Sequence, residues 1–114
     1  MSKASKSWYV YIMTNKPQGV LYIGVTDNIN ARVEEHKTKV FRKSFTAKYN
    51  CDKLVYLEEY HTGSEAALRE KQMKKWKRDW KINLIEGSNA GWHDISLNWN
   101  TSDLIYKTKR SFKE

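Results

Sequence analysis

The sequence predicts a single small α/β domain in which helices flank a three-stranded antiparallel sheet. Three runs rich in aromatic and β-branched residues, each bounded by turn residues, predict the strands. A helix-capping sequence and a long run of helix-forming residues follow the third run. The length of 114 residues suits one hydrophobic core. We expect this domain to span residues 1–99 and residues 100–114 to form a basic C-terminal tail.

The first two strands and the first helix are predicted to form a ββα unit. Residues 7–14 and 20–25 are β-rich, and the sequence Asn-Lys-Pro-Gln-Gly between them predicts a hairpin with a longer loop. Ile29 and Val33 then lie four apart, as one apolar stripe of a short helix ending near Lys37 requires. Three consecutive residues are suitable N-caps for this helix: Thr26, Asp27 and Asn28.

A basic segment separates this unit from the third strand. Residues 38–50 show no clear hydrophobic period and contain no acidic residue, so we expect an irregular or mobile basic loop. Within this loop Phe41, Phe45 and Tyr49 are spaced by four residues, which also allows a helical turn or two. Residues 54–61 predict the third strand.

A long helix is expected after the third strand. Thr62 can cap its start while the side chain of Glu65 reaches back to the cap, as in a capping box. We expect this helix to run to about Lys77 or Trp80, and residues 83–86 to form one last short turn. Its expected core-facing stripe has the helical spacing i, i+3 and i+7 and consists of Met73, Trp76 and Trp80. Beyond the short turn, Trp92 and Trp99 are expected to seal the domain.

Composition and charge exclude several classes of protein. The single cysteine, Cys51, cannot form an internal disulfide, and no apolar run approaches the roughly 18 to 20 residues of a membrane helix. We therefore expect a reduced, cytoplasmic setting and no membrane partner. The 21 basic and 13 acidic residues give a formal net charge of +8, which favours a polyanionic partner such as nucleic acid. A merely basic, soluble surface is the alternative interpretation of this charge.

Five polar residues could form one site. A Tyr-Val-Tyr sequence ends at Tyr11 and a Tyr-Ile-Gly sequence begins at Tyr22, and the hairpin can bring these two tyrosines together. Arg32 and His36 follow at i and i+4, which places both on one face of the first helix. Glu70 is a carboxylate among lysines on the long helix.

This set of residues resembles the GIY-YIG nuclease superfamily, in particular its small stand-alone bacterial members, which are similar to the N-terminal nuclease domain of the excision-repair enzyme UvrC. The first motif keeps only its tyrosine, the second is intact, and the Arg-x-x-x-His pair follows; the resemblance covers residues 8–99. It implies a divalent-metal-dependent endonuclease that cuts DNA, with Mg²⁺ or Mn²⁺ held by Glu70. Asn83 is the nearest match to an asparagine that relatives often place after the long helix, so the resemblance adds it to the expected catalytic residues.

The residue types also suit phosphodiester hydrolysis, which needs an activated water, compensation of charge on the phosphoryl oxygens and help for the leaving oxygen. Arg32 offers a planar fork to the phosphate, and Glu70 can hold an ion that keeps most of its waters. Tyr22 is the expected general base, because positive charge from Arg32 and the metal favours its phenolate. His36 is expected to donate a hydrogen bond to that phenolate or to relay its proton, and Tyr11 to orient the water or the phosphate.

The expected contacts with nucleic acid lie mainly in the basic loop. Val25 stands where several relatives carry a lysine, so Lys37 or Lys39 is expected to supply that phosphate contact. Cations and aromatic rings together are typical of single-strand binding, so we expect single-stranded or structured DNA as the partner, RNA as a second candidate, and a monomer or weak dimer. A non-catalytic nucleic-acid-binding module is the alternative function. The residues expected to contact phosphates are Lys37, Lys39, Arg42, Lys43 and Lys48.

Overall fold

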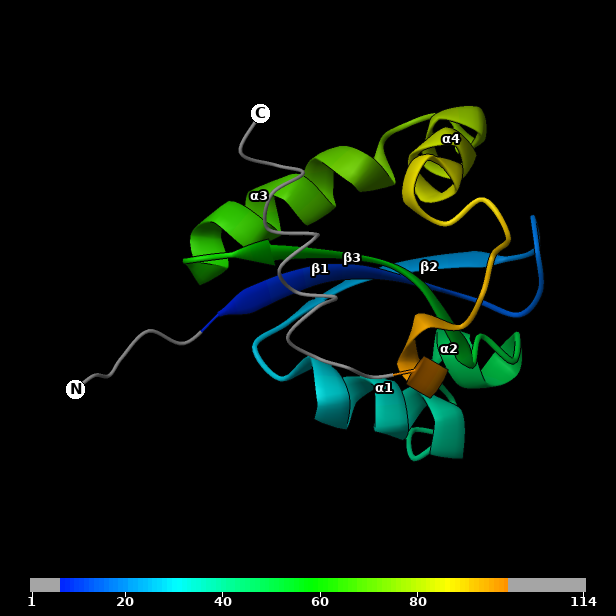
Figure 1. Cartoon of the computed structure of the whole chain (residues 1–114). Helices are drawn as coiled ribbons and strands as arrows, with labels where there is room; N and C mark the ends of the chain where they lie inside the picture. The colour runs from blue at the N-terminus through cyan, green and yellow to red at the C-terminus, as the bar shows by residue number, and fades with distance from the viewer. Residues whose placement is uncertain (1–6, 99–114) are drawn as a thin grey trace.

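The computed structural model describes residues 7–98, in which one sheet lies between two layers of helices (Figure 1). The three strands are β1 (Trp8–Thr14), β2 (Leu21–Thr26) and β3 (Lys53–Tyr60). Their order is β2-β1-β3, and both neighbouring pairs are antiparallel. This arrangement confirms the predicted fold class. The expected basic tail and Trp99 lie outside the described residues.

The first helical layer contains α1 (Ile29–Thr38), the short α2 (Phe45–Lys48) and a 3₁₀ turn, η1 (Ile95–Asn98). Of the three N-cap candidates, Asn28 caps α1, because its side-chain oxygen accepts the backbone N–H of Ala31 at 3.2 Å. The helix ends at Lys39, which has a left-handed backbone with φ 56°. The spacing of the aromatic residues in the basic loop allowed a helical turn, and α2 is such a turn.

The second helical layer contains α3 (Gly63–Lys74) and α4 (Arg78–Ser88). Thr62 caps α3 as predicted, accepting the N–H of Glu65 at 3.2 Å. The prediction of one long helix to residue 77 or 80 is wrong, and so is the isolated turn at residues 83–86, which lies inside α4. Lys77 is extended, and the turn around it allows both Met73 of α3 and Ile85 of α4 to be fully buried against the same sheet.

The two layers enclose separate cores on the two faces of the sheet. Val10 and Ile12 of β1 face α3 and α4, whereas Tyr9, Tyr11 and Met13 face α1, as strand alternation requires. Trp92 is buried in the first core, in agreement with the prediction that it seals the domain.

The expected core stripe is only partly correct. Trp80 leaves 56% of its surface exposed, because the break between α3 and α4 takes it off the face of Met73. Its ring contacts Trp76 instead, with 6.0 Å between the centroids.

Among the helices of residues 7–98, none combines the length and the hydropathy that a membrane span requires.

Candidate active site

Four of the expected site residues meet on the face of the sheet that α1 covers. The ring centroids of Tyr11 and Tyr22 lie 6.1 Å apart, and the imidazole of His36 lies 5.7 Å and 5.4 Å from them. The Tyr11 hydroxyl and Nε2 of His36 are 2.9 Å apart. Arg32 lies one helical turn before His36 and close enough to lower the pKa of Tyr11. We call Tyr11, Tyr22 and His36 the ring cluster.

The antiparallel register explains why a glycine ends the second motif. Gly24 pairs with Tyr11 across the strands, so a side chain at residue 24 would point to the same face as the tyrosine ring. A Cβ on Gly24 would lie 2.5 Å from the Tyr11 hydroxyl, far inside van der Waals contact. The tyrosine is fully buried and has no free space into which to move. Glycine at this position therefore allows the phenol to reach His36.

A chain of hydrogen bonds runs from the ring cluster into α2. The second imidazole nitrogen of His36, Nδ1, lies 2.8 Å from the Thr46 hydroxyl, which lies 3.2 Å from that of Ser44. Ser44 in turn accepts the N–H of Ala47 and caps α2. Tyr11 and Thr46 are both buried, so each hydroxyl depends on these partners. The short helix thereby fixes the orientation of the imidazole.

Burial and charge set the protonation states of Tyr11 and His36 in this series of hydrogen bonds. Burial raises the pKa of Tyr11, as does the Tyr22 hydroxyl, while Arg32 opposes the shift in part. Burial and the cation of Arg32 lower the pKa of His36. A neutral imidazole has one acceptor and one donor nitrogen. Tyr11 O–H can then donate to Nε2 while Nδ1–H of His36 donates to Thr46.

Arg32 is the accessible cation beside the ring cluster. Its side chain is 42% exposed, and its Nε lies 3.1 Å from a carboxylate oxygen of Glu35, three residues along α1. Exposed ion pairs of this kind contribute only about 0–1 kcal/mol, so the guanidinium can exchange this partner for a phosphate at little cost.

Glu70 belongs to the opposite helical layer but lies beside the same edge of the sheet. Its Oε2 is 2.8 Å from Nζ of Lys74, one turn further along α3. Lys74 and Tyr22 line one cavity of about 270 Å³ at β2, which is an edge strand. The Lys74 side chain therefore links Glu70 to the cavity that Tyr22 lines. Within residues 7–98, no group of three or more His, Cys, Asp or Glu side chains could hold a metal ion.

The expected phosphate-binding residues occupy two kinds of position. Lys37 makes internal contacts, since its ammonium donates to the Asp52 carbonyl at 2.8 Å and pairs with Asp94. Burial raises the pKa of the Asp94 carboxyl, but hydrogen bonds from Lys37, the Ser96 hydroxyl and the Leu54 N–H together hold it below the usual range. The basic loop, by contrast, presents three exposed cations: Arg42, Lys43 and Lys48. The fourth loop cation, Lys39, is half-buried at the end of α1.

None of the contacts described for residues 7–98 places Asn83 at the ring cluster. It is exposed in the middle of α4, two residues from Lys81, which lines the cavity at Tyr22. Residues two apart on a helix do not share a face, so Asn83 and Lys81 point in different directions.

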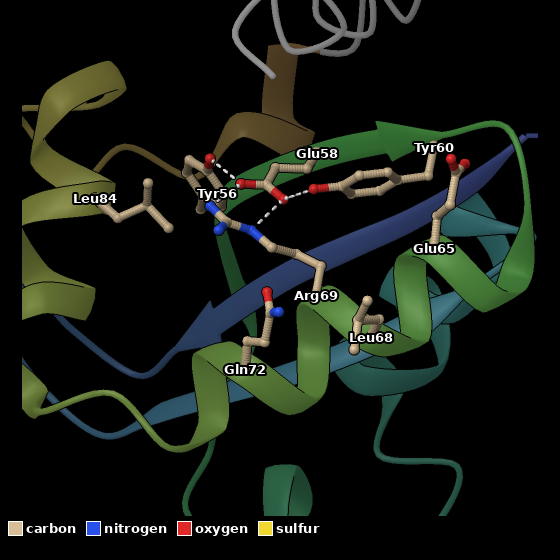
Figure 2. A pocket seen from close by; sticks show the side chains of 8 residues that line it. All are labelled: Tyr56, Glu58, Tyr60, Glu65, Leu68, Arg69, Gln72 and Leu84. Atoms are coloured by element: carbon tan, nitrogen blue, oxygen red, sulfur yellow. Dashed lines mark hydrogen bonds and ion pairs between the residues drawn. The ribbon is translucent and has the colours of Figure 1, made fainter. Parts of the chain in front are cut away.

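A second cavity, of about 540 Å³, lies on the α3 side of the sheet (Figure 2). Its floor is the carboxylate of Glu58, which accepts hydrogen bonds from Tyr56 at 2.6 Å and Tyr60 at 2.7 Å. Arg69 of α3 binds both oxygens of the same carboxylate, at 3.0 and 2.8 Å. Burial and this carboxylate raise the pKa values of both tyrosines, which therefore remain donors. This network fixes the rotation of α3 immediately before Glu70.

Sequence reasoning missed several residues of the site. Thr46 carries no periodic or motif signal, because its role depends on how the loop folds back on α1. Lys74 was expected to pair with Glu70, four residues earlier, if that carboxylate were structural, but not to line a cavity at Tyr22. Lys81 was not considered. The position of both lysines at Tyr22 follows from the unpredicted break between α3 and α4. Phe45 was expected in the loop, and its ring lies 6.0 Å from that of Tyr22.

The chain is similar to several known proteins. A family model described as the GIY-YIG catalytic domain matches residues 7–83. A UPF0213 protein of Desulfotalea psychrophila is 34% identical over 89 residues, which are 78% of this chain and 80% of that protein. A UPF0213 protein of Staphylococcus aureus is 40% identical over 80 residues, which are 70% of this chain and 95% of that protein. The solution NMR structure of a UPF0213 protein from Bacillus halodurans matches with a TM-score of 0.49 and 22% identity, over 83% of this chain and 99% of that chain.

Proposed function

The chain belongs to the GIY-YIG family, whose members are generally endonucleases, and we propose that it hydrolyses phosphodiester bonds of DNA with the help of a divalent metal ion. The observation that carries the proposal is the ring cluster with Arg32 beside it, together with Glu70, which pairs with Lys74 at the cavity that Tyr22 lines. These residues supply a proton acceptor, a phosphate-binding cation and a carboxylate for the metal.

Tyr22 is the proposed general base because it is the accessible tyrosine of the ring cluster. The phenolate form of Tyr22 is the proposed proton acceptor: a water molecule gives a proton to its oxygen while the water oxygen bonds to phosphorus. The bond between phosphorus and the leaving sugar oxygen breaks, and that oxygen takes up a proton from solvent. Arg32 binds the phosphoryl oxygens and compensates the negative charge that develops on them.

Tyr11 and His36 have a different role in this proposal. Tyr11 has no exposed surface, so it acts as a positioning residue that orients Tyr22 and the imidazole rather than touching the phosphate. His36 is almost as buried, and its two nitrogens are taken by Tyr11 and Thr46. His36 therefore acts as a positioning residue that holds the Tyr11 hydroxyl and packs against the Tyr22 ring.

Glu70 is the residue proposed to hold Mg²⁺ or Mn²⁺. Its carboxylate is 20% exposed, and the ion pair with Lys74 uses Oε2. A single carboxylate suits Mg²⁺, which keeps several of its waters in protein sites. When bound, the ion supplies positive charge to the phosphoryl and leaving oxygens.

Single-stranded or locally unpaired DNA is the proposed substrate. The basic loop exposes Phe41, Phe45 and Tyr49, and the last two rings contact each other at 4.7 Å between centroids. Lys48 lies over the Tyr49 ring at 5.4 Å. Rings that stack on bases next to cations that follow the backbone are the means by which single strands are bound. One catalytic set cuts one strand, so a monomer is expected to nick. We place this activity in the cytoplasm, in keeping with the single buried thiol of Cys51.

The proposal is tested by incubating the purified full chain with end-labelled single-stranded DNA, duplex DNA, branched DNA and RNA, each with Mg²⁺, Mn²⁺ or EDTA. We expect cleavage of single-stranded or branched DNA with either metal and none with EDTA. Binding without cleavage in both metals would instead support a non-catalytic nucleic-acid-binding module. Equal or faster cutting of perfect duplex would refute the proposed strand preference.

A further inference from the structure

The cavity of about 270 Å³ at the edge of β2 has two chemically different sides. The rings of Tyr22 and Phe45 form an aromatic wall and are inclined by only 32°. Leu21 and Ile23, which alternate with Tyr22 along β2, line the cavity from the face that α3 and α4 cover. Phe45 is 46% exposed, so its ring is available to a ligand. A flat, apolar ligand can therefore lie against this wall.

The other side of the cavity is cationic. Lys74 at the end of α3 and Lys81 in α4 both line it, and each comes from a different helix. Lys74 is already paired with Glu70, whereas the contact found for Lys81 is a long one, 3.5 Å, to the carbonyl of Lys74. Lys81 therefore offers charge to an anion in the cavity without first breaking an ion pair that the structure records.

An aromatic wall opposite two ammonium groups fits one nucleotide better than a continuous duplex. A nucleobase has a flat π-face for the rings, and the phosphate that follows it has negative charge for the lysines. A paired base would have both faces covered by its neighbours in the stack. The ligand must therefore be an unpaired nucleotide.

We propose that this cavity binds one unpaired nucleotide next to the scissile phosphate, with its base against Phe45 and Tyr22 and its phosphate at Lys81. This inference rests on the proposed nuclease function and adds a subsite to it. The subsite explains why Tyr22 is shared between the ring cluster and the cavity. Binding of the base brings the neighbouring phosphate to the Tyr22 hydroxyl.

The test measures binding in EDTA, so that it does not depend on cleavage. Fluorescence anisotropy gives the affinity of the full chain for a short labelled single-stranded oligonucleotide and for the same backbone without bases. We expect removal of the bases to weaken binding about tenfold in the parent, the order expected for one stacked base. Phe45→Ala should reduce this difference, while Phe45→Trp should keep it. Leu68→Ala, which removes an exposed apolar side chain from α3 and not from the basic loop, is the control and should also keep the difference.

Lys81 is tested separately with the same probes. Lys81→Gln should weaken both probes equally and reduce the slope of log affinity against log salt by about 0.7, whereas the exposed-lysine control Lys71→Gln should not. The inference is overturned if Phe45→Ala distinguishes the two probes as the parent does, or if the control Leu68→Ala loses the distinction equally. The proposed nuclease function fails by a different result, the absence of metal-dependent cleavage.

Discussion

The network around Glu58 gives the sharpest quantitative prediction for the fold that supports the site. The Glu58 side chain is 2% exposed and pairs with Arg69, whose side chain is 26% exposed. In Arg69→Met the methionine keeps most of the apolar contacts of the arginine but removes the positive charge. The carboxylate then stays buried with only Tyr56 and Tyr60 as donors.

The expected loss of stability follows from this burial. Removing one partner of a buried ion pair typically costs about 3–5 kcal/mol, because the remaining charge is uncompensated. With a urea slope near 1.5 kcal/mol per M, the midpoint of unfolding should fall by about 2–3 M. Adding Glu58→Gln to Arg69→Met removes the buried charge but keeps an acceptor for the tyrosines. The double variant should therefore be more stable than the single variant.

Urea unfolding followed by circular dichroism measures these differences. Lys71→Met is the matched control, since it removes an exposed charge from the same helix and should change stability by less than about 0.5 kcal/mol. An Arg69→Met protein as stable as Lys71→Met would refute the reasoning. So would a double variant that is less stable than Arg69→Met.

Three further predictions concern the site. Tyr22→Phe should lower the single-turnover cleavage rate at least about 100-fold in a folded protein, because the phenolic oxygen transfers the proton and the ring does the packing; a parent-like rate would move the general base elsewhere. Neutralising the four loop cations should flatten the slope of log duplex affinity against log salt by up to about 3 or 4 units, and an unchanged slope would place the DNA path on α3 and α4. These cations are Lys39, Arg42, Lys43 and Lys48. Because burial lowers the pKa of His36, the unfolded chain takes up the proton first as pH falls below about 6.5. The folded state should therefore lose stability below that pH, and His36→Gln should show a flatter loss in urea unfolding measured at successive pH values.

The strands and the first helix could be predicted because their signals are local. Aromatic and β-branched runs mark all three strands to within one residue, and Asn28 was among the expected caps. The break after α3 could not be predicted, because no glycine or proline lies between Lys74 and Arg78. It results from burial of residues on both helices against one sheet, which is a tertiary effect that overrides the local helical pattern.

The candidate site likewise contains residues that local sequence signals predict and residues that only the tertiary structure brings in. The hairpin was enough to expect Tyr11 and Tyr22 together, and the resemblance to the GIY-YIG family added His36; the ring contacts of all three agree. Thr46 and Lys81 could not be found, since each reaches the site through a loop or a helix break that has no local signature. The internal ion pair of Lys37 was also hidden, because Asp94 lies 57 residues away.

The most direct test of the nuclease account compares Glu70→Ala with the parent protein in metal-dependent cleavage and in DNA binding. The account predicts that Glu70→Ala loses cleavage in both Mg²⁺ and Mn²⁺ while its affinity for DNA stays within a few-fold of the parent, because the carboxylate holds the ion rather than the strand. Glu65→Ala, which removes an exposed acid from the same helix, should cut at the parent rate. If folded Glu70→Ala cuts as fast as the parent, the metal assignment and the mechanism built on it are contradicted.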